Sequence, residues 1–136
     1  MNLEVLPGDF SVCKVAGYNG IDLAAPFVFT GATDFEKSLV CPTLLVPRVT
    51  LVREDGWRAL RVRGPLDFSL VGILAALSTI LANAGVGLFA VSTFDTDYLL
   101  VKADDLPRAL DALRTAGHDV ADPRSPLNRA LDSPLP

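Results

Sequence analysis

Strand-like and helix-like stretches alternate between residues 57 and 121, and this alternation constrains the fold more than any other feature of the sequence. Between residues 70 and 81, large apolar side chains recur at the i, i+3, i+4, i+7 spacing of one helix face. A second helix is expected with Pro107 in its first turn, where the missing amide donor costs little. The predicted order is strand 57–63, helix 70–81, strand 87–93, strand 98–103, helix 106–116 and strand 118–121, which is the α+β, ferredoxin-like βαββαβ plan.

Capping residues set the expected ends of the two helices. Asp67 or Ser69 is expected to cap the first helix, because a side-chain oxygen there satisfies amides that have no intrahelical partner. Asp104 and Asp105 are expected to cap the second helix, and Gly117 to end it. The buried face of the second helix is predicted to consist of four residues, Leu106, Ala109, Leu110 and Leu113.

The first half of the chain has strand-like runs but no convincing helix. Residues 27–41 align with residues 87–102, since both read as apolar strand, a turn with Thr and Asp, and apolar strand. In the first copy only residues 18–26 join the hairpin to the preceding strand, too few for a long helix. The apolar sheet face of this half therefore needs cover from the second copy or from another subunit, as in a homodimer. The expected strands are 3–6, 10–15, 27–30, 38–41 and 49–53.

We therefore expect a truncated, helix-poor lobe at residues 1–54, a complete βαββαβ domain at 55–122 and a proline-rich tail at 123–136. A net charge of -4 argues against a nucleic-acid surface, which needs clustered Lys and Arg. The apolar segment 70–91 is long enough to suggest a transmembrane helix, but Asn83 and the glycines after it favour a helix end followed by a strand. No signal peptide is recognisable, so a cytoplasmic location is expected.

The sequence has no recognisable catalytic, metal or cofactor motif. It contains none of the patterns GxGxxG, GxxxxGK[ST], GxSxG or HExxH. Cys13 and Cys41 each lie in an apolar strand-like run without a CxxC spacing, and we expect both to be buried, reduced thiols. The sequence therefore favours a protein that is not an enzyme and that holds neither a cofactor nor a metal ion.

Residues 55–102 resemble the ACT-domain proteins, specifically the small bacterial tandem-ACT family related to the cytosolic arginine sensors. The resemblance covers most of the chain and is weaker around Cys13 and Cys41. It implies a regulatory module that binds an amino acid. The ligand would be held at a domain or subunit interface by the first strand-to-helix loop and nearby strands.

Two polar turns, at residues 64–72 and 92–97, carry the candidate binding site. A free amino acid presents a carboxylate and an ammonium group on one carbon. The amides at the N-terminus of the first helix, near Ser69, can bind the carboxylate, which the helix dipole also favours. Asp95 or Asp97 can bind the ammonium group. The sequence thus predicts an amino acid ligand whose identity the turns do not specify.

Other residues of these turns complete the predicted site. Gly72, expected one turn into the first helix, would leave space for a ligand, and the hydroxyl groups of Ser92, Thr93 and Thr96 would add hydrogen-bonding groups. The full set of expected ligand-binding residues is Asp67, Phe68, Ser69, Gly72, Ser92, Thr93, Phe94, Asp95 and Asp97.

Each of these residues also has a purely structural interpretation. Asp67 can be a helix cap, and Gly72 a site of close helix packing. Asp95 and Thr96 can be ordinary turn residues. Phe68 and Phe94 can belong to the core or to an interface. The alternative function is accordingly a protein interaction module without a small ligand, and an enzyme acting on an amino acid is a weaker one.

Overall fold

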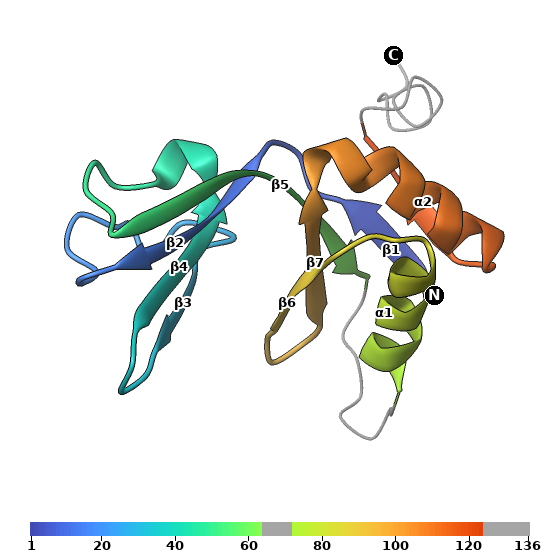
Figure 1. The fold of residues 1–136 in the computed structure, drawn as a ribbon, viewed down its shortest axis with the longest axis horizontal. Helices are drawn as coiled ribbons and strands as arrows, with labels where there is room; N and C mark the ends of the chain where they lie inside the picture. Colours follow the sequence, from blue (N-terminus) through green and yellow to red (C-terminus); the bar gives the residue numbers. More distant parts are fainter. Residues whose placement is uncertain (64–71, 124–136) are drawn as a thin grey trace, which may run out of the picture. The chain divides into compact units, whose positions relative to one another are not determined.

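The computed structural model describes residues 1–63 and 72–123, and the chain forms two compact units. Unit 1 consists of Met1–Pro7 together with the chain from Arg58 onward, and unit 2 consists of Gly8–Trp57. The first seven residues, which the sequence pattern assigns to the first lobe, are therefore part of the second one. Figure 1 shows the elements of each unit.

Unit 1 confirms the ferredoxin-like α+β prediction (Figure 1). Its sheet has the strand order β6-β7-β5-β1-β8, in which only the later residues of β5 belong to this unit. Strand β1 lies between β5 and β8, antiparallel to β5 and parallel to β8, so it widens the four-stranded plan by one strand. The elements are β1 (Asn2–Val5), β5 (Val52–Val62), α1 (Ile73–Asn83), β6 (Phe89–Ser92), β7 (Asp97–Lys102), α2 (Leu106–Thr115) and β8 (Asp119–Ala121).

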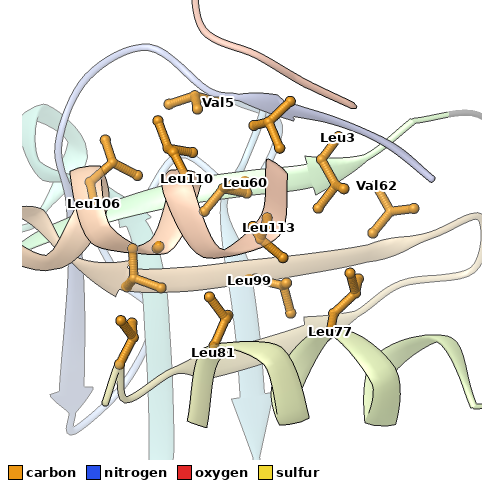
Figure 2. Packing of buried hydrophobic residues seen from close by; sticks show 14 residues of the cluster. Leu3, Val5, Leu60, Val62, Leu77, Leu81, Leu99, Leu106, Leu110 and Leu113 are labelled. Carbon is orange, nitrogen blue, oxygen red and sulfur yellow. The ribbon is translucent and has the colours of Figure 1, made fainter. Parts of the chain in front are cut away.

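The core of unit 1 lies between its sheet and its two helices. Figure 2 shows Leu77 and Leu81 of α1 and Leu110 and Leu113 of α2 directed toward strand residues such as Leu99. All four residues predicted for the buried face of α2 are buried, whereas in α1 Ile73, Leu74 and Ile80 are only partly buried. Of the helices that the structure describes, neither has the length and apolar character needed to cross a membrane.

Unit 2 has the strand order of a ferredoxin-like sheet but no α-helix in residues 8–57, all of which the structure describes. The order β3-β4-β2-β5 is antiparallel throughout, and this confirms a helix-poor first half. Loop side chains replace the helices: Tyr18, Ile21, Val28, Leu45 and Val46 pack on Cys13, Val15, Leu39 and Cys41. The further strands are β2 (Phe10–Val15), β3 (Phe29–Ala32) and β4 (Lys37–Pro42).

The repeat inferred from the sequence is present as two matching hairpins. Hairpin β3–β4 pairs Phe29 with Val40, and hairpin β6–β7 pairs Phe89 with Leu100, so each residue has a counterpart 60 positions later. The turns match as well, because the amide of Thr33 donates to the carbonyl oxygen of Glu36 as that of Thr93 does to Thr96. Each hairpin is followed by a 3₁₀ turn of three residues.

Strand β5 differs from the prediction. The sequence suggested two strands, 49–53 and 57–63, separated by charged residues, whereas the structure has one strand from Val52 to Val62. The register against β2 shifts between Phe10 and Val12, and Gly56 has φ of 84°, a conformation that favours glycine. A β-bulge therefore accommodates the charged stretch without ending the strand.

Candidate functional site

The β6–β7 turn holds five of the predicted site residues in a compact hydrogen-bonded loop. The hydroxyl of Ser92 donates a 2.6 Å bond to Oδ1 of Asp97 across the end of the hairpin. Both the amide and the hydroxyl of Thr93 donate to the carbonyl oxygen of Thr96, at 2.9 and 3.0 Å. Asp97 is half-buried and Asp95 is exposed. The turn therefore presents two carboxylates, of which one is oriented by a neighbouring hydroxyl.

Thr96 attaches this turn to the end of β5. Its hydroxyl donates a 2.7 Å hydrogen bond to the carbonyl oxygen of Val62, and its side chain is buried. Val62 is the last residue of β5, the strand that precedes α1 in the sequence. The structure thus places the second polar turn against the end of β5. Thr96 was expected either to offer a hydroxyl to the ligand or to be an ordinary turn residue, and its anchoring role was missed because the sequence does not show which carbonyl the turn would meet.

Helix α1 begins later than the sequence suggested. It starts at Ile73 with Gly72 at the N-cap position, so the predictions of Asp67 or Ser69 as the cap and of Gly72 inside the helix are wrong. Gly72 has φ of 82°, and a Cβ added there would meet no atom within 4 Å. Backbone conformation, not crowding, therefore requires glycine here. Asp67, Phe68 and Ser69 lie outside the residues that the structure describes.

The N-terminal end of α1 and the β6–β7 turn lie at the same end of unit 1, where β5 also ends (Figures 1 and 2). Gly72 has no side chain that could accept hydrogen bonds from the first amides of α1, and no acidic residue occupies the first turn of the helix. This end of unit 1 thus combines backbone donors from the helix with carboxylate acceptors from the turn.

Phe94 does not belong to the core, since its side chain is 79% exposed. The interpretation of this residue as part of the core is therefore wrong. Phe94 lies at the tip of the turn and is followed by Asp95 in the sequence, and both residues are exposed on the surface of unit 1.

The matching turn of unit 2 has different chemistry. Lys37 takes the position of Asp97, and Ala32 takes that of Ser92. The carboxylate of Glu36 accepts a 2.8 Å hydrogen bond from the hydroxyl of Ser38. The oriented carboxylate that ends the turn of unit 1 is thus replaced by a cation in unit 2, although the two backbones match.

The two cysteines are buried on one face of unit 2. The register pairs Cys13 with Leu39 and Cys41 with Ser11, which makes the thiols diagonal neighbours on β2 and β4. Burial raises the pKa of both thiols, that of Cys41 to about 11. Arg53 opposes this increase only in part. Few thiolates exist at neutral pH, which argues against a catalytic cysteine in this unit.

A polar cluster beside the thiols joins two strands, β2 and β5, to the 3₁₀ turn that follows β4. The hydroxyl of Ser11 donates to Oδ1 of Asp55 and lies 2.8 Å from the hydroxyl of Thr43. Arg53 donates a 2.8 Å hydrogen bond to the same carboxylate oxygen. The hydrogen bond from Arg53, and to a smaller extent the one from Ser11, lowers the pKa of Asp55. Because these side chains form hydrogen bonds with one another, we interpret the cluster as structural.

One prediction about the second helix is also corrected. Asp105 stands at the N-cap position of α2 but makes no capping bond with its side chain. Its Oδ1 instead accepts a 2.8 Å hydrogen bond from Arg108, one turn into the helix. Pro107 lies in the first turn as predicted.

The sequence of this chain matches a known protein family and a relative of known name. The family model described as an ACT domain matches residues 52–115. Cytosolic arginine sensor for mTORC1 subunit 1 of Rattus norvegicus is 37% identical over 59 residues, which are 43% of this chain and 18% of the sensor. The chain thus spans less than a fifth of that relative.

Two solved structures extend the comparison. The X-ray crystal structure of a protein from Agobacterium tumefaciens matches 89% of this chain and 92% of that chain, at 32% identity and a TM-score of 0.78. Aspartate kinase of Clostridium acetobutylicum, described as an allosteric enzyme, matches 84% of this chain and 33% of its own at 12% identity and a TM-score of 0.60, which shows a shared fold. Together with the βαββαβ order of unit 1, these matches establish that the chain belongs to the ACT-domain proteins.

Proposed function

We propose that this protein is a regulatory amino acid sensor without catalytic activity, and that it binds its ligand at the end of unit 1 that carries both the β6–β7 turn and the N-terminus of α1. The observation that carries the proposal is the hydrogen bond from Ser92 to Asp97, which orients a half-buried carboxylate at this end. The name of the rat relative, an arginine sensor, supports an amino acid as the ligand class.

The carboxylate of Asp97 is suited to an α-ammonium group. An ionised carboxylate offers about four acceptor positions, and the bond from Ser92 uses one of them. The hydroxyls of Ser92 and Thr93 donate within the turn, so their oxygens remain able to accept hydrogen bonds. Asp95 adds a second negative charge at the tip. The turn therefore provides the acceptors that an ammonium group needs.

The beginning of α1 is suited to the carboxylate of the same ligand. Its first amides have no intrahelical partner, and Gly72 cannot cap them with a side chain. A helix N-terminus also carries a partial positive charge that stabilises an anion. Asp67, Phe68 and Ser69, which precede α1 in the sequence, remain proposed members of the site. Regulation then requires only that the ligand prefers one state of the protein over another.

A thermal-shift screen against the common amino acids tests the proposal. A ligand at about 100 times its dissociation constant stabilises the folded state by about 2.7 kcal/mol, which raises the melting midpoint by several degrees for a chain of this size. We expect a selective increase with one amino acid or a few related ones. A flat screen contradicts the proposal, and turnover of any amino acid by the pure protein contradicts the non-enzymatic part.

A second candidate function is a protein interaction module that binds no small ligand. Unit 2 favours it, because Leu44 and Val49 of its loop are almost fully exposed. A flat thermal-shift screen combined with stable association of the chain with another protein would support this candidate over the sensor.

A further inference from the structure

An open pocket of about 600 Å³ lies in unit 1, where the beginnings of β1 and β8 meet the C-terminal end of α2. Small-molecule sites in proteins have volumes of about 300–1,000 Å³, so this pocket is large enough for a ligand. None of the described residues that line it belongs to α1 or to the β6–β7 turn. The pocket is therefore separate from the amino acid site proposed above.

Backbone hydrogen bonds fix the residues that line the pocket. The amide of Arg63, the residue after β5, donates a 2.8 Å bond to the carbonyl oxygen of Asn2. Gly117, with φ of 98°, ends α2 in a Schellman turn, in which the amide of His118 donates a 3.1 Å bond to the carbonyl oxygen of Leu113. The side chains around the pocket thus extend from backbone positions that the fold determines.

Two arginines and one histidine line this pocket. Nη2 of Arg114 donates a 2.8 Å hydrogen bond to the carbonyl oxygen of Val120, which holds the guanidinium group beside β8. Nδ1 of His118 lies 2.9 Å from the amino nitrogen of Met1, and this contact holds the imidazole ring. Arg63 is exposed, and its side chain forms no hydrogen bond or ion pair with any residue that the structure describes.

The two guanidinium groups have no anionic partner among the described residues, although the chain as a whole has a net charge of -4. Asp119 is the one acidic residue among the described residues that line the pocket, and it forms no ion pair with either arginine. The C-terminal end of α2 carries a partial negative charge, so the backbone there does not attract an anion. The positive charge of the pocket therefore comes from the side chains of Arg63 and Arg114.

We propose that this pocket binds a phosphate group, free or as part of a small phosphorylated molecule, through Arg63 and Arg114. A guanidinium group presents a planar fork of donors that matches two phosphate oxygens. Asn2 and His118 supply further hydrogen-bonding groups at the same pocket. The volume exceeds that of a phosphate ion and leaves room for an organic group. Nucleic acid does not fit, because its long charged backbone needs an extended basic surface.

A titration of the isotope-labelled chain with inorganic phosphate, AMP and ATP tests this proposal, with the ionic strength held constant by sodium chloride. We expect saturable amide shifts at residues 2–3 and 117–121. Equal affinities for phosphate and the nucleotides would identify free phosphate as the ligand source, and tighter binding of a nucleotide would identify a phosphorylated molecule. No saturable binding of any of the three up to about 10 mM overturns the proposal, as do shifts confined to residues 73–75 and 92–97.

Arginine variants then test the residues. Arg63→Gln should weaken binding by about 10- to 100-fold, the range expected when a charged hydrogen-bonding group is lost. The variant should keep its melting midpoint, because the side chain of Arg63 forms no hydrogen bond or ion pair with a described residue. Arg114→Lys keeps the charge but loses the planar fork, and it should also weaken binding.

Arg108→Gln is the matched control, because it removes the same charge from an exposed position of α2 that does not line the pocket. Its affinity for phosphate compounds should equal that of the wild type. Equal weakening in Arg108→Gln and Arg63→Gln would show only an effect of net charge and would overturn the proposal. Unchanged affinity in both Arg63→Gln and Arg114→Lys would overturn it as well. The proposal does not rest on the amino acid site, so neither result bears on the sensor function.

Discussion

The hydroxyl of Thr96 donates a 2.7 Å hydrogen bond to the carbonyl oxygen of Val62, and this bond fixes the β6–β7 turn to the last residue of β5. The chain continues from β5 to α1, so the bond fixes the β6–β7 turn to the strand that precedes α1 in the sequence. Both partners lie in the interior of unit 1. The site is thus supported by a structural contact that itself need not touch the ligand.

Thr96→Val should destabilise the protein by about 1–3 kcal/mol, because the carbonyl oxygen of Val62 loses its hydrogen bond while it stays buried. Urea unfolding followed by circular dichroism measures the difference. Thr93→Val is the matched control: Thr93 is exposed, and its amide also donates to the acceptor that its hydroxyl contacts. Equal loss of stability in the two variants would show that the Thr96 bond has no special role.

Gly72→Ala should destabilise the protein by about 1–2 kcal/mol, since an L-residue is strained at the left-handed φ of 82°. The added methyl group would meet no atom within 4 Å, so the whole effect comes from the backbone. In Gly87→Ala the new Cβ has similar space but φ lies outside the left-handed region, and stability should be unchanged or increase by up to about 1 kcal/mol. Thermal melts of both variants make the comparison, and identical midpoints would refute it.

Asp97→Asn should weaken amino acid binding by about 10- to 100-fold, the range expected when a charged group is removed from a hydrogen bond. The substitution keeps the shape of the side chain, and Ser92 can still donate to the amide oxygen. Lys37→Ala changes the counterpart position in unit 2 and should leave the affinity unchanged. Calorimetry gives both affinities. Loss of binding in Lys37→Ala, with full binding in Asp97→Asn, would place the ligand on the wrong unit for our proposal.

The raised pKa of Cys41 predicts that the folded protein loses stability under alkaline conditions. Burial raises this pKa from 9.0 to about 11 in the folded protein, whereas the unfolded chain ionises near the lower value. Between pH 9 and 11 the unfolded state therefore loses a proton that the folded state keeps, and the free energy of unfolding falls as the pH rises. Cys41→Ala should show a smaller decrease over this range. Urea unfolding at several pH values under reducing conditions compares the slopes, and equal slopes would contradict the assignment.

The periodicity of apolar residues predicted unit 1 well, because its helices and strands follow from local sequence patterns. The four buried leucine and alanine positions of α2 repeat at helical spacing, and all four are in the core. The hairpin repeat was visible because strand, turn and strand have the same lengths in both copies. Strand β1 was predicted as a strand, but its pairing with β5 and β8 depends on tertiary contacts that no local pattern encodes.

The predictions that failed depended on single turns. The bulge at Gly56 lets β5 continue through Glu54 and Asp55, whereas charge and glycine alone suggested a break. The start of α1 was placed near Asp67 and Ser69 because their side chains favour caps, but the left-handed Gly72 begins the helix. For the site, sequence identified the turn around Asp97 through its polar residues. It could not reveal the bond from Thr96 to Val62, which joins residues far apart in the chain.

The most direct test of the proposed sensor is a titration of isotope-labelled protein with the common amino acids, followed by amide chemical shifts. We predict that one amino acid moves the amides of Ile73, Leu74 and Ala75 at the start of α1, together with those of residues 92–97. The matching turn at residues 32–37 of unit 2 should not move, because Lys37 stands where Asp97 would be needed. Shifts confined to unit 2 would contradict the proposed site, and no shifts with any amino acid would contradict the sensor function itself.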